Sequence, residues 1–137
     1  MTRDRFRMIW KTWHFNNNEE LTDKSDRLSK IRPLLNYFVP KFINVYKPIQ
    51  QLSLDEGIIP WRGRLFFRVY NPMKIVKYGI LVRILCESTT GYMCHFEIYC
   101  AEGKRLIDTI ETIVSPYTDL WHHIYMDNYY NIYNIYK

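Results

Sequence analysis

Residues 79–99 read GILVRILCESTTGYMCHFEIY, and this stretch decides the expected fold. Its first part, residues 79–86, is a nearly continuous apolar run, which is typical of a strand in the interior of a sheet. Residues 88–91 predict a turn, and in residues 92–99 the side chains alternate between two faces, as they do in a paired strand. Because the link between the two runs is short, we expect them to pair antiparallel.

Two further strands and one helix are expected on either side of this pair. Residues 49–56 show a strand pattern that ends in an acidic pair, and residues 104–115 carry apolar side chains at helical spacing. Residues 123–126 predict a short last strand. Short links favour antiparallel pairing of the first three strands, and the helical crossover allows the fourth to add in parallel. The order predicts a mixed α/β fold, the first half of an RNase H-like mixed sheet with helices.

The first 48 residues predict a helical segment, so we expect two regions, residues 1–48 and residues 49–137. One helix is expected after Thr2, which can cap it, and a second begins near Pro33. Pro40 is expected to kink or end the second helix. Each helix carries an apolar stripe, which we interpret as a core face; the alternative is an interaction surface. The first stripe is Phe6, Ile9, Trp10 and Trp13, and the second is Ile31, Leu34, Leu35 and Phe38.

Composition favours a folded, mildly basic protein. The 137 residues are 47% hydrophobic and 17% aromatic, which argues against disorder, and the net charge of +5 favours a polyanionic partner. With no apolar run of membrane-spanning length and no secretory signal, no membrane partner is expected. Three cysteines without zinc-type spacing predict a reduced, intracellular location.

Asp55 and Asp127 are the candidate metal-binding residues. They end two strands that are neighbours in the predicted sheet, so their carboxylates could share one divalent ion. Phosphodiester cleavage by two metal ions needs several such carboxylates. The alternative is that each aspartate caps a helix or forms a turn.

A basic, aromatic segment, residues 61–77, is the candidate nucleic-acid contact. Cationic side chains interleaved with aromatic ones suit phosphate contact combined with stacking on bases. The alternative is a solvated hairpin with its aromatic side chains packed inward. The candidate DNA-binding residues are Arg62, Arg64, Arg68, Lys74 and Lys77.

Other possible sites have less support in the sequence. His122 and His123 precede Asp127 and could act as metal ligands, but we expect an exposed pair at the start of a strand. Cys86 and Cys94 are expected to be core thiols, and zinc is not expected. With no phosphate-binding or dinucleotide-binding glycine motif and no hydrolase triad, no organic cofactor is expected.

Five motifs in order resemble the piggyBac-type DDE transposase family: KIRPLLNYF, LSLDEGIIPWRGR, YNPMKIVKYGI, CESTTGY and MDNYY. The resemblance implies an RNase H-like domain that cuts and joins DNA, acting in the nucleus with Mg²⁺ or Mn²⁺. It matches Asp55 and Asp127 to two catalytic metal ligands, and it assigns the N-terminal helices to dimerisation and DNA binding.

The family pattern also includes a third aspartate in a later part of the domain, for which this chain has no match. We therefore expect a truncated, transposable element-derived protein that binds DNA weakly, binds the metal weakly or not at all, and lacks catalysis. One alternative is an active enzyme completed by further chain. Another is a non-enzymatic module that binds a protein partner or a second copy of itself.

Overall fold

The computed structural model describes residues 1–17, 19 and 25–131. They divide into two compact units, Met1–Phe38 and Val39–Lys137, with the division inside helix α2 (Arg32–Val45). The predicted boundary between residues 48 and 49 refers to regions of the resembled family, and it stays a prediction. Among the described residues, no helix is long and apolar enough to cross a membrane.

The first unit begins with the predicted helix, α1 (Arg3–Thr12). The Thr2 hydroxyl caps it by accepting a hydrogen bond from the Arg5 amide over 3.4 Å. Before α2, the Asp26 carboxylate accepts two hydrogen bonds from the Arg32 guanidinium, at 2.7 and 2.6 Å. The Arg32 hydrogen bond holds the pKa of Asp26 below its usual value, so this ion pair is formed at neutral pH.

The expectation that both apolar stripes are core faces is wrong for α1, in which no residue is buried. Trp10 is 63% exposed, and its ring contacts the Phe6 and Trp13 rings at centroid distances of 5.9 and 5.6 Å. The aromatic side chains therefore pack along their own helix, and no residue of the stripe is covered within the described part. In the second stripe, Phe38 is 46% exposed and the other three residues are half-buried.

Pro40 lies inside α2 and does not end it, because the helix continues to Val45. Contacts beyond the proline hold the last turns. The Phe42 ring meets the Phe96 ring edge-on at 5.9 Å, and the Phe42 carbonyl accepts a hydrogen bond from the Tyr92 hydroxyl over 3.1 Å. Tertiary packing thus outweighs the loss of one helical hydrogen bond at the proline.

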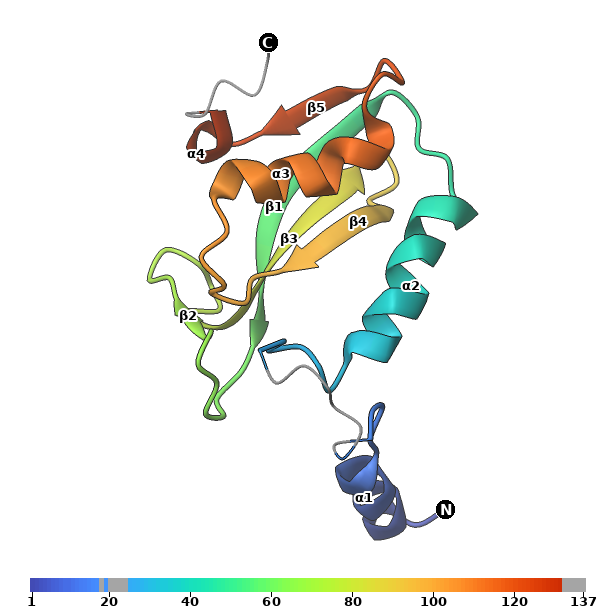
Figure 1. Cartoon of the computed structure of the whole chain (residues 1–137), viewed down its shortest axis with the longest axis vertical. Helices are drawn as coiled ribbons and strands as arrows, with labels where there is room; N and C mark the ends of the chain where they lie inside the picture. Colours follow the sequence, from blue (N-terminus) through green and yellow to red (C-terminus); the bar gives the residue numbers. More distant parts are fainter. Residues whose placement is uncertain (18, 20–24, 132–137) are drawn as a thin grey trace. The chain divides into compact units, whose positions relative to one another are not determined.

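The second unit is a mixed five-stranded sheet, and it confirms the predicted fold class (Figure 1). Neighbouring strands follow the order β2-β3-β1-β5, and β4 also pairs with β3. β1 is antiparallel to β3 and parallel to β5, and β3 is antiparallel to β4, as the link lengths predict. The strands are β1 (Gln51–Pro60), β2 (Val69–Tyr70), β3 (Tyr78–Glu87), β4 (Met93–Ile98) and β5 (His123–Met126).

β1 is longer than the sequence predicts, because it runs through the acidic pair to Pro60. β3 is equally long and pairs with it as far as Pro60↔Gly79. At that point the chains are very close: a Cβ atom on Gly79 would lie 2.0 Å from the Ile59 carbonyl oxygen. Glycine at position 79 therefore allows the two strands to pair along their whole length.

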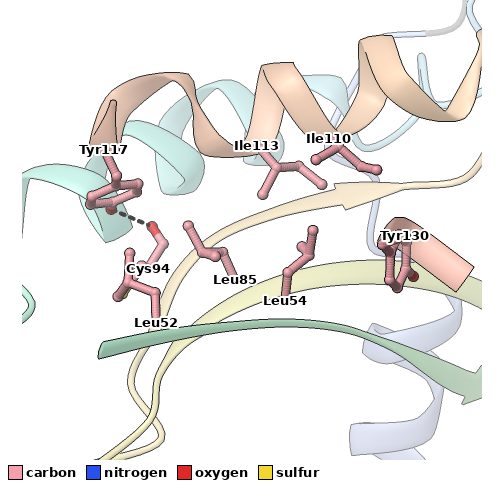
Figure 2. Close-up of a cluster of buried hydrophobic side chains, with 8 residues drawn as sticks. All are labelled: Leu52, Leu54, Leu85, Cys94, Ile110, Ile113, Tyr117 and Tyr130. Atoms are coloured by element: carbon pink, nitrogen blue, oxygen red, sulfur yellow. Dashed lines mark hydrogen bonds between the residues drawn. The ribbon is translucent and has the colours of Figure 1, made fainter. Parts of the chain in front are cut away.

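Helix α3 (Leu106–Val114) covers one face of the sheet, followed by a 3₁₀ turn (Ser115–Tyr117), β5 and the short helix α4 (Asn128–Asn131) (Figure 1). The core lies between α3 and the sheet, with Tyr117 and Tyr130 at opposite ends (Figure 2). Each large apolar side chain buried there contributes about 1.5–3 kcal/mol. The buried members are Leu52, Leu54, Leu85, Cys94, Ile110, Ile113, Tyr117 and Tyr130.

The tyrosine and the cysteine at one end of this core are uncharged. The Tyr117 hydroxyl donates a hydrogen bond to the Cys94 carbonyl over 3.2 Å (Figure 2). Burial raises the pKa of Tyr117 to about 12 and that of the Cys94 thiol to about 11. Cys94 is the core thiol that the sequence predicts, whereas Cys86 is only half-buried.

Candidate functional site

The pairing of β1 with β5 brings the two candidate aspartates together. The last pair in their parallel register is Leu54↔Met126, so Asp55 and Asp127 are the next residues on each chain. Adjacent strands lie about 4.8 Å apart, and residues at equal register in parallel strands share a face. The prediction that these two strands are neighbours is confirmed.

Asp55 lies on the face of β1 away from the core, because Leu54 is buried and side chains alternate along a strand. Asp127 is the residue between the end of β5 and the start of α4. The Asp55 side chain is 69% exposed, and Asp127 is exposed as well. Both carboxylates are therefore accessible to ions from solvent.

Each aspartate also has a local structural role. An Asp55 carboxylate oxygen accepts the Glu56 amide hydrogen over 2.7 Å. At the start of α4, an Asp127 carboxylate oxygen is 3.4 Å from the Tyr129 nitrogen, and the Asp127 carbonyl accepts from the Tyr130 amide over 2.9 Å. The helix-capping alternative thus holds for Asp127, although capping leaves its second carboxylate oxygen available to a cation.

Glu56 adds a third carboxylate near the first two, on the core side of β1. Its side chain is 20% exposed, and it accepts a hydrogen bond from the Tyr130 hydroxyl over 2.5 Å. Burial opposes ionisation of Glu56, but the hydrogen bonds from Tyr130 and from the Lys74 ammonium outweigh it and lower its pKa. Burial, together with the same contact with Glu56, raises the pKa of Tyr130.

The carboxylate oxygens of Asp55 and Asp127 are hard ligands of the kind that Mg²⁺ binds, with water as its other ligands. Within residues 1–17, 19 and 25–131, no three His, Cys, Asp or Glu side chains converge as metal ligands would. A pair of ions in a phosphodiester-cleaving site is held between several carboxylates.

The basic segment surrounds an open hollow beside the β2–β3 pair. The hollow has a volume of about 650 Å³, and its wall includes the cations Arg62, Arg68 and Lys77 and the half-exposed rings of Trp61 and Tyr78. Arg68 lies over the Tyr78 ring, 5.6 Å from its centroid. Three of the five predicted DNA-binding residues are thus brought together.

The other two predicted DNA-binding residues, Arg64 and Lys74, lie outside that wall. Arg64 is exposed and is not part of that wall, whereas the Lys74 ammonium lies 3.2 Å from Glu56 and 3.9 Å from Asp55. The alternative, in which the aromatic side chains of the segment pack inward, holds for Phe67, which is buried. The neighbouring Phe66 is 82% exposed.

The histidine pair divides between two roles. His123 is exposed, as expected for the start of a strand. His122 is half-buried, its Nδ1 lies 3.0 Å from the Ile49 carbonyl oxygen, and its ring meets Tyr117 edge-on. These contacts give His122 a structural role at the entry to β5.

Glu87 is a fully buried charged residue that the sequence patterns do not single out. It has no exposed surface, and its carboxylate accepts hydrogen bonds from the Thr90 hydroxyl, the Ile49 amide (2.8 Å) and the Tyr46 hydroxyl (3.0 Å). These hydrogen bonds, led by that of Thr90, lower the pKa of Glu87. A glutamate that directly follows an apolar strand and precedes a turn was the available signal.

A model of the Transposase IS4 family matches the chain over residues 1–137. The chain is 31% identical over 106 residues to human PiggyBac transposable element-derived protein 3, covering 77% of this chain and 17% of that protein. It is 34% identical over 97 residues to human PiggyBac transposable element-derived protein 2, covering 69% of this chain and 16% of that protein.

The fold matches a cryo-EM structure of a piggyBac transposase synaptic complex with hairpin DNA, with a TM-score of 0.79 and 27% identity. The match covers 85% of this chain and 26% of the other. Fold and sequence thus define a DDE transposase-type protein. The chain belongs to the IS4/piggyBac-type DDE transposase family, and it spans about a sixth of the length of the two human relatives.

Proposed function

We propose that this chain contacts DNA through its basic segment 61–77 and binds one divalent cation at Asp55 and Asp127, without cleaving DNA by itself. The position of the basic segment carries this proposal. The segment follows directly on β1, which holds Asp55, and it returns to the same strand through the contacts of Lys74 with Asp55 and Glu56. A phosphate bound beside Lys74 would therefore lie near Asp55, whereas one bound in the hollow would lie beside Pro60, where β1 ends.

The wall of the hollow provides the two chemical features that binding to DNA needs. Arg62, Arg68 and Lys77 supply positive charge for phosphate oxygens, and the half-exposed Trp61 ring supplies a surface on which a base can stack. The Tyr78 ring is already in contact with the Tyr70 ring and with Arg68. The similar piggyBac transposase supports this proposal, since its structure is that of a complex with hairpin DNA. A DNA partner would make the nucleus the location of the protein.

The cation would be Mg²⁺ or Mn²⁺, which DDE transposases use. When bound, such an ion polarises a phosphate oxygen and lowers the pKa of a bound water. Asp55 and Asp127 would hold and orient it, and Asp55 would keep its geometry through the hydrogen bond from the Glu56 amide. Two carboxylates do not supply the ligands for a second ion, so we expect no strand cleavage from these residues alone.

Two other functions remain as candidates because specific observations favour each. The adjacency of Asp55 and Asp127 suits an active transposase in which further chain, or a second copy, provides a third carboxylate. The exposed aromatic stripe of α1, with Trp10 and Trp13 at 63% and 56% exposure, suits a module that binds a protein partner or dimerises.

DNA affinity measured over a salt series tests the proposal. The double variant Arg62→Ala/Arg64→Ala should bind labelled duplex DNA more weakly, and the slope of log affinity against log salt should fall by about 0.9 for each phosphate that the variant no longer neutralises. The matched control is Lys104→Ala/Arg105→Ala, which removes two charges already paired with Glu97 and Asp108 and should leave the slope unchanged. Equal weakening in both variants would contradict a role for the basic segment.

A nicking assay with Mg²⁺ or Mn²⁺ separates the candidates. Under the proposal, no nicked product forms. Metal-dependent nicking that disappears with Asp55→Asn would instead establish the active enzyme. Absence of both DNA binding and nicking, with stable self-association that Trp10→Ala abolishes, would establish the interaction module.

A further inference from the structure

The Lys74 ammonium occupies the space beside the carboxylates of β1. Its Nζ atom lies 3.2 Å from a Glu56 carboxylate oxygen, 3.4 Å from the Glu56 carbonyl oxygen and 3.9 Å from an Asp55 carboxylate oxygen. One side-chain cation thus interacts with both carboxylates of β1.

The backbone explains why this lysine reaches the site. Asn71 begins a turn in which its side-chain oxygen accepts the Met73 amide and its carbonyl is 3.4 Å from the Lys74 amide nitrogen. This turn directs the segment back to β1 at the point where β5 has ended. There the Glu56 carbonyl is free of pairing with β5, so it can accept a hydrogen bond from the ammonium.

We propose that Lys74 holds the place of the divalent cation and must withdraw before a metal ion binds at Asp55 and Asp127, so that Lys74 sets the metal affinity of the chain. This inference rests on the proposed cation site. A metal ion and the Lys74 ammonium, each within about 4 Å of the same carboxylate, repel each other. At low metal concentration this repulsion prevents the ion and the ammonium from being bound there at the same time.

The side chain is suited to such an exchange. Lys74 is a point charge on a flexible four-carbon stem, and its side chain is 36% exposed, so it can rotate into solvent without disturbing the sheet. Its contacts with Asp55 and Glu56 are partly exposed ion pairs, which are weak and easily exchanged. Lysine at this position would keep the carboxylates from repelling one another while no metal is bound.

Mn²⁺ titration of the purified chain, followed by the electron paramagnetic resonance signal of free Mn²⁺, tests this inference. Lys74→Met should bind Mn²⁺ about fivefold or more tightly than the natural chain, because a unit charge about 4 Å away is removed. Lys77→Met is the matched control: it removes the same charge from the same segment, at an exposed position, and should change affinity by less than about twofold. Lys74→Gln provides a second neutral variant with the same expected gain.

The outcomes separate this inference from the cation site on which it rests. If Lys74→Met and Lys74→Gln gain no more affinity than Lys77→Met, Lys74 does not compete with the metal and this inference is overturned, while the carboxylate pair stands. If the Lys74→Met variant binds Mn²⁺ equally well after Asp55→Asn is added, the bound ion lies elsewhere. Both the proposed cation site and this inference are then overturned. A gain that Asp55→Asn abolishes supports both.

Discussion

The hydroxyl of Tyr130 donates a hydrogen bond to the carboxylate of Glu56 over 2.5 Å, and this contact joins the chain just beyond Asp127 to the chain just beyond Asp55. Tyr130 is 1% exposed and belongs to the core cluster, at the end near α4 (Figure 2). A partly buried, charge-assisted hydrogen bond thus fixes the middle of β1 relative to the chain that follows β5. The positions of the two candidate metal ligands depend on it.

Tyr130→Phe should therefore destabilise the second unit. The variant keeps the buried ring and removes only the hydroxyl, and hydrogen bonds to charged groups contribute about 1.5–3 kcal/mol. Urea unfolding should show a lower midpoint with an unchanged slope. Tyr129→Phe is the control, because Tyr129 is 59% exposed and should lose less than about 0.5 kcal/mol. Equal effects of the two changes would show that the contact with Glu56 is unimportant.

Glu87 should make stability depend on pH in the acid range. Its folded pKa is lowered, so its contribution is complete above the ordinary value of 4.5 and is lost as pH falls below 4.5 through the lowered pKa. Melting temperatures recorded from neutral pH downward should fall more steeply for the natural chain than for Glu87→Gln. Glu102→Gln, at an exposed position, should follow the natural chain. Parallel curves for Glu87→Gln and the natural chain would refute this role.

Ile113→Ala should test the packing of α3 on the sheet. Ile113 has no exposed surface, and truncating such a side chain costs about 2–5 kcal/mol through reduced burial and the cavity left behind. Glu111→Ala, on the exposed side of the same helix, should change stability by no more than about 0.5 kcal/mol. Calorimetric unfolding measures both, and a loss below about 1 kcal/mol for Ile113→Ala would contradict the described core.

Much of the second unit could be predicted, because the sequence patterns that identify its strands and helix lie within short segments. The apolar run at residues 79–86 and the alternation at residues 92–99 identify an interior strand and its antiparallel neighbour, and both are present as β3 and β4. The crossover through α3 predicts a parallel fourth strand, which is β5 beside β1. From that pairing alone, the adjacency of Asp55 and Asp127 follows.

What could not be predicted depends on contacts between distant residues. No local pattern indicates that Glu87 accepts hydrogen bonds from Tyr46 and from the Ile49 amide, far earlier in the chain. Periodicity identifies the apolar stripe of α1 but does not say what covers it, which is why the core expectation there is wrong. For the same reason, the sequence groups Lys74 with phosphate-binding cations, although its ammonium contacts Glu56 and Asp55.

The shared cation site of Asp55 and Asp127 is tested most directly by NMR with Mn²⁺, whose unpaired electrons broaden the signals of nearby nuclei. We predict that substoichiometric Mn²⁺ broadens the amide signals of Glu56 and Asn128 together, that both effects disappear with either Asp55→Asn or Asp127→Asn, and that excess Mg²⁺ reverses them. Broadening of only one of the two signals, or broadening that survives either substitution, would contradict a cation held between the two aspartates.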